Sequence, residues 1–220
     1  MKLESNGILI SLRPFDEKNA VAKIFTRDYG IIVGMMRGAV VAKSNKPLVG
    51  QIGTATWNAR IDSALGVFHW DAEKNLAVPM MNDFQLLTFM NAAFDLIGIC
   101  LPEREPYATL YDATLKLMTE LPKSSQPQND YLMWEMTLLR EMGYALDLSR
   151  CSGCGAVSNL VYLSPKTGRA VCESCGAPYR ERLYNLPITT DITLNFLEKI
   201  CNDMGATVPH FRKIITTKKI

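Results

Sequence analysis

The chain has 220 residues, of which 48% are hydrophobic and 21% are charged, and its formal net charge is +2. This composition excludes a disordered or fibrous protein, and the length allows one or two domains with a smaller insert. The N-terminus, MKLESNGILI, has no apolar core of a signal peptide. The most apolar segment, 84–101, contains Gln85, Asn91 and Asp95, which favours a buried helix over a membrane span. We therefore expect a cytoplasmic protein without a membrane segment, whose thiols stay reduced.

Charge is distributed unevenly along the chain. Residues 1–60 contain nine Lys/Arg against four Asp/Glu, whereas residues 61–220 contain 15 against 18. A basic first quarter favours an anionic partner for that part of the protein, and the alternative is a solvated basic face without a partner.

The first eighty residues predict short strands separated by turns. Asp28-Tyr29-Gly30 is typical of a hairpin turn, and residues 41–50 (VAKSNKPLVG) predict a flexible basic loop. No helical pattern separates the strands, so we expect a small β-barrel over residues 1–80 instead of a βαβ unit. Runs rich in Ile, Val and Phe lie at 7–13, 20–26, 30–37, 51–58 and 65–70, with 75–80 as a sixth candidate.

Helical periodicity dominates from residue 81 onward. The predicted fold class is therefore α+β, with an N-terminal small β-barrel at 1–80 and an all-α helical domain at 81–220 that carries an inserted cysteine segment at about 148–180. The expected helices run from a cap at Asn82 or Asp83 to Ile99, from Leu110 to Leu121, from a cap at Asn129 or Asp130 to Met142, and from a cap at Thr190 to Met204.

Four cysteines form two matched pairs, Cys151 with Cys154 and Cys172 with Cys175. The spacing C-x2-C-x17-C-x2-C is typical of a tetrahedral zinc site, because two intervening residues let one tight turn direct both sulfurs at the same ion. These four residues are the predicted ligands of one structural Zn²⁺. The segment is too short to bury a core alone, so we expect metal binding to fold it.

The residues around the two pairs predict a zinc ribbon. Strands at 160–163 and 169–171 are joined by the turn 164–168. Gly155 and Gly176 each follow the second cysteine of a pair, and we expect both to adopt positive φ and bring backbone N–H groups toward the sulfurs.

Redox, iron–sulfur and catalytic zinc sites fit the cysteines less well. A thioredoxin-like pair is single and opens a helix, ferredoxins space their cysteines more closely, and catalytic zinc keeps an open position. The sequence also contains no nucleotide-binding, nucleophile-elbow or zinc-protease motif. We therefore expect a protein that is not an enzyme.

A basic barrel followed by a helical domain with a four-cysteine ribbon resembles the bacterial recombination-mediator family RecO. The resemblance implies an oligonucleotide/oligosaccharide-binding (OB) barrel, a helical domain and a zinc ribbon. It is carried by residues 25–32 (FTRDYGII), 36–39 (MRGA), 43–44 (KS), 151–155 (CSGCG), 162–165 (YLSP), Gly168 and 172–175 (CESC).

The resemblance also implies a function in recombinational DNA repair. Members of this family bind single- and double-stranded DNA, anneal strands, and cooperate with RecR in loading RecA onto DNA covered by single-stranded-DNA-binding protein. This chain departs from the family at Val40 and Val41, where further Arg or Lys is common, so its DNA affinity is expected to be weaker or to depend on other surfaces.

The residues themselves support a DNA-binding role, because single-strand binding needs cations along the phosphates and aromatic rings for stacking. The barrel region supplies Phe25, Tyr29, Trp57, Phe68 and Trp70 as aromatic candidates, most of which we expect in the core. The alternative function is a zinc-ribbon adaptor that contacts proteins without binding DNA. The predicted DNA contacts are Arg13, Lys23, Arg27, Arg37, Lys43, Lys46 and Arg60. We expect these contacts to be independent of the DNA sequence, because nothing in their pattern indicates recognition of particular bases.

Overall fold

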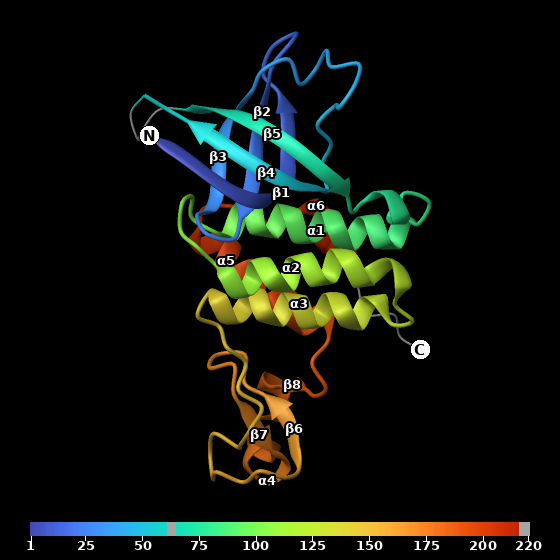
Figure 1. Ribbon diagram of the computed structural model, residues 1–220. Helices are drawn as coiled ribbons and strands as arrows, with labels where there is room; N and C mark the ends of the chain where they lie inside the picture. Colours follow the sequence, from blue (N-terminus) through green and yellow to red (C-terminus); the bar gives the residue numbers. More distant parts are fainter. Residues whose placement is uncertain (61–64, 216–220) are drawn as a thin grey trace.

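The computed structural model describes residues 1–60 and 65–215, and the chain forms three parts stacked along one long axis (Figure 1). A β-barrel occupies one end, a layer of helices lies in the middle, and the cysteine segment occupies the other end. The helices therefore separate the two parts of the chain to which the sequence assigns binding chemistry.

Five strands close into a barrel with the neighbour order β1-β2-β3-β5-β4. The pairs are antiparallel except β3 and β5, which run parallel where residues 34–36 meet residues 66–68. A five-stranded barrel with this order is an OB fold, so the predicted fold of this part is confirmed. The strands are β1 (Lys2–Pro14), β2 (Ala20–Thr26), β3 (Gly30–Met36), β4 (Gln51–Asn58) and β5 (Gly66–Asn75).

Residues 75–80 do not form the predicted sixth strand. β5 ends at Asn75, and the chain enters a short 3-10 helix, η1 (Val78–Met80). The Asn75 side chain accepts a hydrogen bond from the backbone N–H of Ala77 (2.8 Å), a local bond that turns the chain away from the sheet. Pro79 follows, and it has no N–H to donate to a strand ladder.

The barrel interior contains a tryptophan that only a glycine on the neighbouring strand can accommodate. Trp57 of β4 is fully buried, and its indole N–H donates to the carbonyl of Val33 (3.0 Å). A Cβ atom on Gly66 of β5 would lie 2.2 Å from the Trp57 ring, so a larger residue cannot occupy that position without a shift. Outward-facing residues such as Phe25 and Ile31 pack against the helices and share their core.

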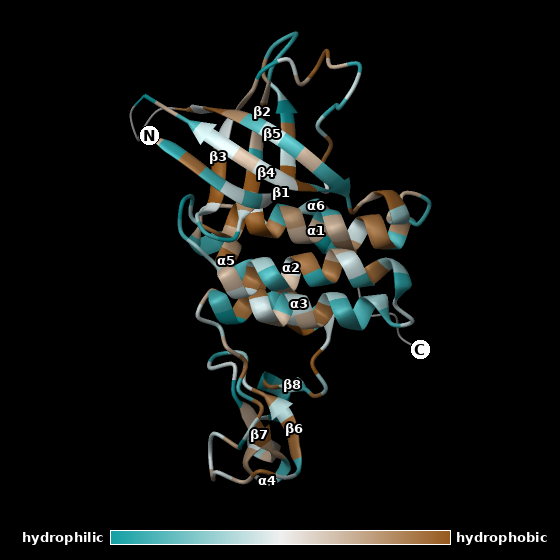
Figure 2. Ribbon diagram, in the orientation of Figure 1, coloured by the Kyte–Doolittle hydropathy of each residue, from teal (hydrophilic) through white to brown (hydrophobic). Residues whose placement is uncertain are grey.

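Three helices form the front of the middle layer, and two more lie behind them (Figure 1). The first helix lies against the barrel, and hydrophobic residues run along most of its length (Figure 2). Among the helices in residues 1–60 and 65–215, none is both long and apolar enough to cross a membrane. The helices are α1 (Phe84–Cys100), α2 (Ala108–Glu120), α3 (Pro127–Glu141), α5 (Thr190–Asp203) and α6 (His210–Lys213), with a 3-10 turn, η2 (Leu121–Lys123), after α2.

The four predicted helices are present, but three of them begin at a different residue, and one of these is α2, which begins at Ala108 instead of Leu110. Asp83 caps α1 as predicted, since its carboxylate accepts hydrogen bonds from two backbone N–H groups of the first turn (2.8 and 3.1 Å). α3 begins at Pro127, before the predicted cap at 129 or 130, because proline suits the first position of a helix. In α5 the N-cap is Thr189, and Thr190 is already the first helical residue.

Contacts from β2 and the β2–β3 turn join the barrel to the helices. The Lys23 ammonium donates to a backbone carbonyl of α1 (3.1 Å), and Arg27 forms two hydrogen bonds of 3.0 Å to the Asp112 carboxylate on α2. A Cβ atom on Gly30 would lie 1.8 Å from the carbonyl oxygen of Glu105. The β2–β3 turn therefore packs closely on the segment that connects α1 to α2. These contacts hold the barrel on the helical layer.

A buried ion pair lies inside the helical layer, and no pattern in the sequence predicted it. Glu135 of α3 and Arg212 of α6 are fully buried, and the Arg212 guanidinium donates two hydrogen bonds to the Glu135 carboxylate. The hydroxyls of Thr193 in α5 (2.6 Å) and Tyr131 in α3 (3.2 Å) donate to the same carboxylate. Burial and the neighbouring carboxylate raise the pKa of Tyr131, so it stays a donor. One charged cluster thus ties three helices together.

The cysteine segment leaves the helical layer between α3 and α5 and extends away from it (Figure 1). Its first two strands pair antiparallel, which confirms the predicted hairpin, and Gly168 takes φ +66° at the turn. A further strand, which the sequence did not indicate, pairs with the first and extends the segment past residue 180. We call residues 148–186 the ribbon. Its elements are β6 (Leu160–Leu163), β7 (Ala170–Cys172), α4 (Glu173–Gly176), η3 (Ala177–Arg182) and β8 (Tyr184–Asn185).

Candidate nucleic-acid interface and metal centre

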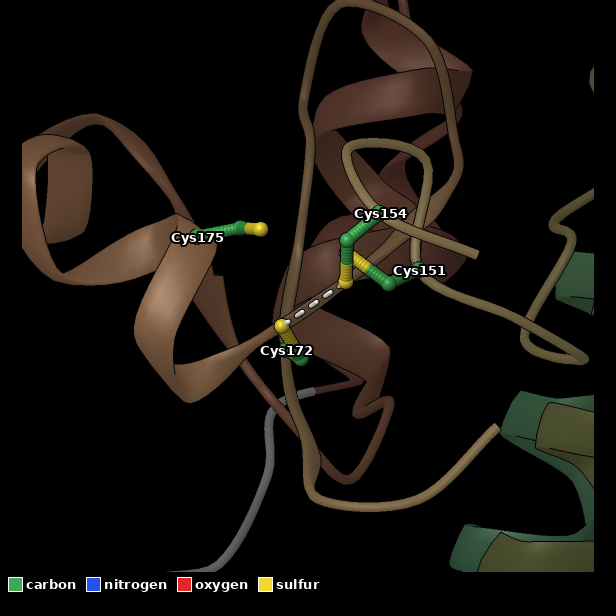
Figure 3. A group of neighbouring side chains, drawn as sticks. All are labelled: Cys151, Cys154, Cys172 and Cys175. Carbon is green, nitrogen blue, oxygen red and sulfur yellow. Dashed lines mark hydrogen bonds between the residues drawn. The ribbon is translucent and has the colours of Figure 1, made fainter. Parts of the chain in front are cut away.

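The four ribbon cysteines meet at one point, as their spacing predicts. Cys151 and Cys154 come from the turn before β6, Cys172 ends β7, and Cys175 points its sulfur toward the others from α4 (Figure 3). The four sulfur atoms lie within 4.8 Å of one another, and the Sγ atoms of Cys154 and Cys172 are 3.7 Å apart. Four sulfurs at about 2.3 Å from a tetrahedral zinc ion would be about 3.8 Å apart. The cluster can therefore hold a metal ion.

Hydrogen bonds around the sulfurs favour the thiolate form at two of the four cysteines. Backbone N–H groups, first those of Cys172 and Cys154, lower the pKa of Cys151 to about 6. The hydroxyl of Ser174, 3.3 Å from the sulfur of Cys172, is the main cause of that thiol's lowered pKa. Hydrogen bonding to neighbouring sulfurs raises the pKa of Cys175 to about 12. A divalent cation bound by the four sulfurs would displace the proton of Cys175.

Glycine is required for different physical reasons at the two positions that follow the cysteine pairs. Gly155 takes φ +79°, as predicted. The prediction for Gly176 is wrong, because this residue has φ −84°; a Cβ atom there would lie 2.3 Å from the ring of Tyr162. Close packing, and not backbone conformation, therefore requires Gly176. Backbone N–H groups do reach the sulfur of Cys151, and that of Gly153 lies 3.3 Å from it.

Basic side chains gather at the end of the barrel that points away from the helices. The loop of residues 37–50 and the turn of residues 15–19 both lie there (Figure 1). They are joined by hydrogen bonds from the N–H of Val40 to the carbonyl of Lys18 (3.0 Å) and from the N–H of Gly38 to the side chain of Asn19 (3.1 Å). We call the four exposed cations of this end the basic tip. They are Lys18, Arg37, Lys43 and Lys46.

Sequence reasoning missed Lys18 of the basic tip, although it found the other three. The signal that places Lys18 there is the strand register, since Ala20 pairs with Pro14 on one side and with Met36 on the other. That register puts the β1–β2 turn beside the loop that follows β3. Within residues 1–60 and 65–215, none of the four cations forms an ion pair.

Gln51 ties the loop of the basic tip to the barrel wall. Its side-chain oxygen accepts from the N–H of Leu48 (3.0 Å) and from the indole N–H of Trp70 (3.1 Å), and its amide nitrogen donates to the carbonyl of Lys46 (3.3 Å). One amide side chain thus links the loop to β4 and β5. The position of Lys46 therefore depends on Gln51.

A groove of about 190 Å³ opens beside the basic tip. Arg37, Asn45, His69 and Trp70 contribute to its walls. Most of the aromatic residues proposed for stacking are instead core residues, as expected, because Phe25, Trp57 and Phe68 are buried. Trp70 and Tyr29 are partly exposed; Trp70 lines this groove together with the buried Phe68, and Tyr29 does not. The groove therefore combines a cation with a ring on which a base can stack.

The other predicted DNA contacts lie elsewhere on the barrel. The charges of Lys23 and Arg27 are engaged with the helical layer, as described above. Arg13 is close enough to Asp95 of α1 to act on it electrostatically. Arg60 is exposed just after β4, on the chain segment beside the N-terminus. The structure thus brings three of the seven predicted residues together in the basic tip and leaves four outside it.

Comparison with known proteins places this chain in one family. The model of the recombination protein O N-terminal domain matches residues 1–66, and that of the C-terminal domain matches residues 81–207. The chain is 35% identical to the DNA repair protein RecO of Ruegeria sp. (strain TM1040) over 188 residues, which cover 85% of this chain and 78% of the relative. It is 37% identical to the DNA repair protein RecO of Rhodospirillum centenum over 190 residues, covering 85% and 76%. The chain therefore belongs to the RecO family of DNA repair proteins.

Proposed function

We propose that the chain is a recombination mediator that binds single- and double-stranded DNA through the basic tip. In this proposal it anneals strands in the cytoplasm and, with RecR, helps to load RecA onto DNA covered by single-stranded-DNA-binding protein. The observation that carries the proposal is the set of four exposed cations beside a groove lined by Trp70. Such contacts reach phosphates and the faces of bases, which are common to every sequence, so binding is expected to be sequence-independent.

We further propose that the ribbon holds one structural zinc ion and that the protein is not an enzyme. Four protein thiolates complete the tetrahedral coordination of zinc, so such a site offers no position to a substrate or an activated water. The four sulfurs lie close enough together for this role. Holding the ribbon in its fold is then the contribution of the metal.

Charge reversal in the basic tip tests the proposed DNA binding. The double variant Lys43→Glu with Lys46→Glu should bind single-stranded oligo-dT about tenfold or more weakly at low salt, because two phosphate contacts become repulsive. The logarithm of the binding constant falls as the logarithm of the salt concentration rises, and this slope should become less steep by about 1.4, since two phosphate contacts are lost. A fluorescence anisotropy titration at several salt concentrations, with and without RecR, measures both quantities.

The matched control is Lys116→Glu with Lys123→Glu, which changes the net charge equally but lies on α2 and η2, outside the basic tip. It should leave DNA affinity nearly unchanged. If the unmodified protein binds no DNA at low salt even with RecR, the proposal is wrong. A pull-down of partner proteins that survives nuclease treatment would then favour the adaptor.

Removing the amide of Gln51 tests whether the position of the loop matters for DNA binding. Gln51→Ala keeps every cation of the basic tip but removes the hydrogen bonds that hold the loop of residues 37–50 beside Trp70. DNA binding must then order this loop, and the lost conformational entropy weakens the affinity. We expect about threefold weaker binding of oligo-dT and a change in tryptophan fluorescence. Gln85→Ala on the exposed start of α1 serves as the control. Equal affinities of the two variants would show that the loop needs no tether.

A further inference from the structure

The sign of the charge alternates along the long axis of the molecule. The ribbon contains five Lys/Arg against two Asp/Glu, and the barrel end, residues 1–60 and 65–80, contains ten against six. The helical layer between them, residues 81–147 and 187–215, contains seven Lys/Arg against 13 Asp/Glu. A polyanion is therefore attracted to both ends of the molecule and repelled by its middle.

The exposed side chains of η3 concentrate the positive charge of the ribbon beside an aromatic ring. Tyr179 is 60% exposed, and Arg180 and Arg182 are exposed as well. In a 3-10 helix residues three positions apart lie on the same side, which places Tyr179 and Arg182 together. Neither arginine forms an ion pair with any described residue of the chain. The residues of η3 also line a surface recess of about 370 Å³.

An exposed ring beside unpaired guanidinium groups matches what a single nucleic-acid strand needs. Bases stack on tyrosine whatever their sequence, and arginine binds phosphate through its planar fork of donors. A core role does not explain Tyr179, because most of its surface is exposed. Glu181 lies between the two arginines in sequence, but the recess retains a net positive charge.

We propose that Tyr179, Arg180 and Arg182 form a second contact site for single-stranded nucleic acid. This inference rests on the proposed function, since the basic tip provides the first site. The barrel and the ribbon lie at opposite ends of the helical layer (Figure 1), so one molecule holds two strands at once, one at each site. The acidic layer between the two sites keeps a single strand from lying along the whole molecule.

A strand-capture assay tests the second site. Oligo-dT is immobilised and saturated with protein, and a fluorescent second oligo-dT, which cannot pair with the first, is then added. The full chain should capture the second strand. The variant Arg180→Glu with Arg182→Glu should capture about tenfold less, and Tyr179→Ala about threefold to tenfold less, because charge contacts and one stacking contact are lost. Binding of the first strand by these variants should change by less than about twofold, since the basic tip is intact.

The controls separate failure of this inference from failure of the proposed function. Lys116→Glu with Lys123→Glu carries the same charge change on the helical layer and should capture strands like the unmodified protein. If the unmodified protein binds no first strand, the proposed function fails. If it binds the first strand but the arginine variant captures the second equally well, the second site is refuted while the basic tip stands. Such a result would favour an acidic protein as the partner of Tyr179, Arg180 and Arg182.

Discussion

Replacing Glu135 by alanine is expected to lower the free energy of unfolding by about 3–5 kcal/mol. The carboxylate is fully buried, and it accepts hydrogen bonds from the Arg212 guanidinium and from Thr193 and Tyr131. Its removal leaves the Arg212 charge buried without a counter-ion, and the desolvation of that charge is then uncompensated. Urea denaturation followed by circular dichroism measures the change.

A double replacement separates the cost of an unpaired charge from the net contribution of the pair. Glu135→Leu together with Arg212→Met removes both charges and should recover most of the lost stability, because a buried pair is often no better than apolar side chains of similar size. As a surface control, Glu120→Ala breaks the exposed pair with Lys116 (3.9 Å) and should cost less than about 0.5 kcal/mol. A loss below about 1 kcal/mol for Glu135→Ala would contradict the buried pair.

Removing the proposed zinc ion is expected to unfold the ribbon while the barrel and helices stay folded. The ribbon has a small core of its own, made of Cys151, Val171 and Cys172 with partly buried neighbours. Structural zinc sites contribute about 10–16 kcal/mol of apparent binding energy, far more than so few apolar contacts can. The variant Cys154→Ser, or a strong chelator, should therefore make residues 148–186 sensitive to proteases. Mass spectrometry of the fragments locates the cleavage sites.

Metal content and thiol reactivity complete this test. The unmodified protein should contain one zinc per chain, and its four ribbon thiols should react with an alkylating agent only after chelation. Ser152→Ala, an exposed change next to Cys151, should leave both properties unchanged. A protein that contains no metal and whose ribbon still resists proteases would refute the structural role of zinc.

Features that depend on nearby residues were predictable. The strand runs of the barrel, the turn at Gly30, the Asp83 cap and the ribbon hairpin all follow from patterns within a few residues. Errors occurred where packing decides. Residues 75–80 have the composition of a strand but turn at Asn75, and Gly176 is required by contact with Tyr162 and not by its own backbone angles.

The sequence by itself determined the order of the elements, the four-thiol cluster and the excess of positive charge in the first sixty residues, because these are local or compositional properties. Only the tertiary structure decided which charges are engaged and with which partner. Arg27 meets Asp112 across 85 positions, and Glu135 meets Arg212 across 77. Lys18 joins the basic tip through strand register. Ion pairing depends on distances between segments that are remote in sequence, and folding alone sets those distances.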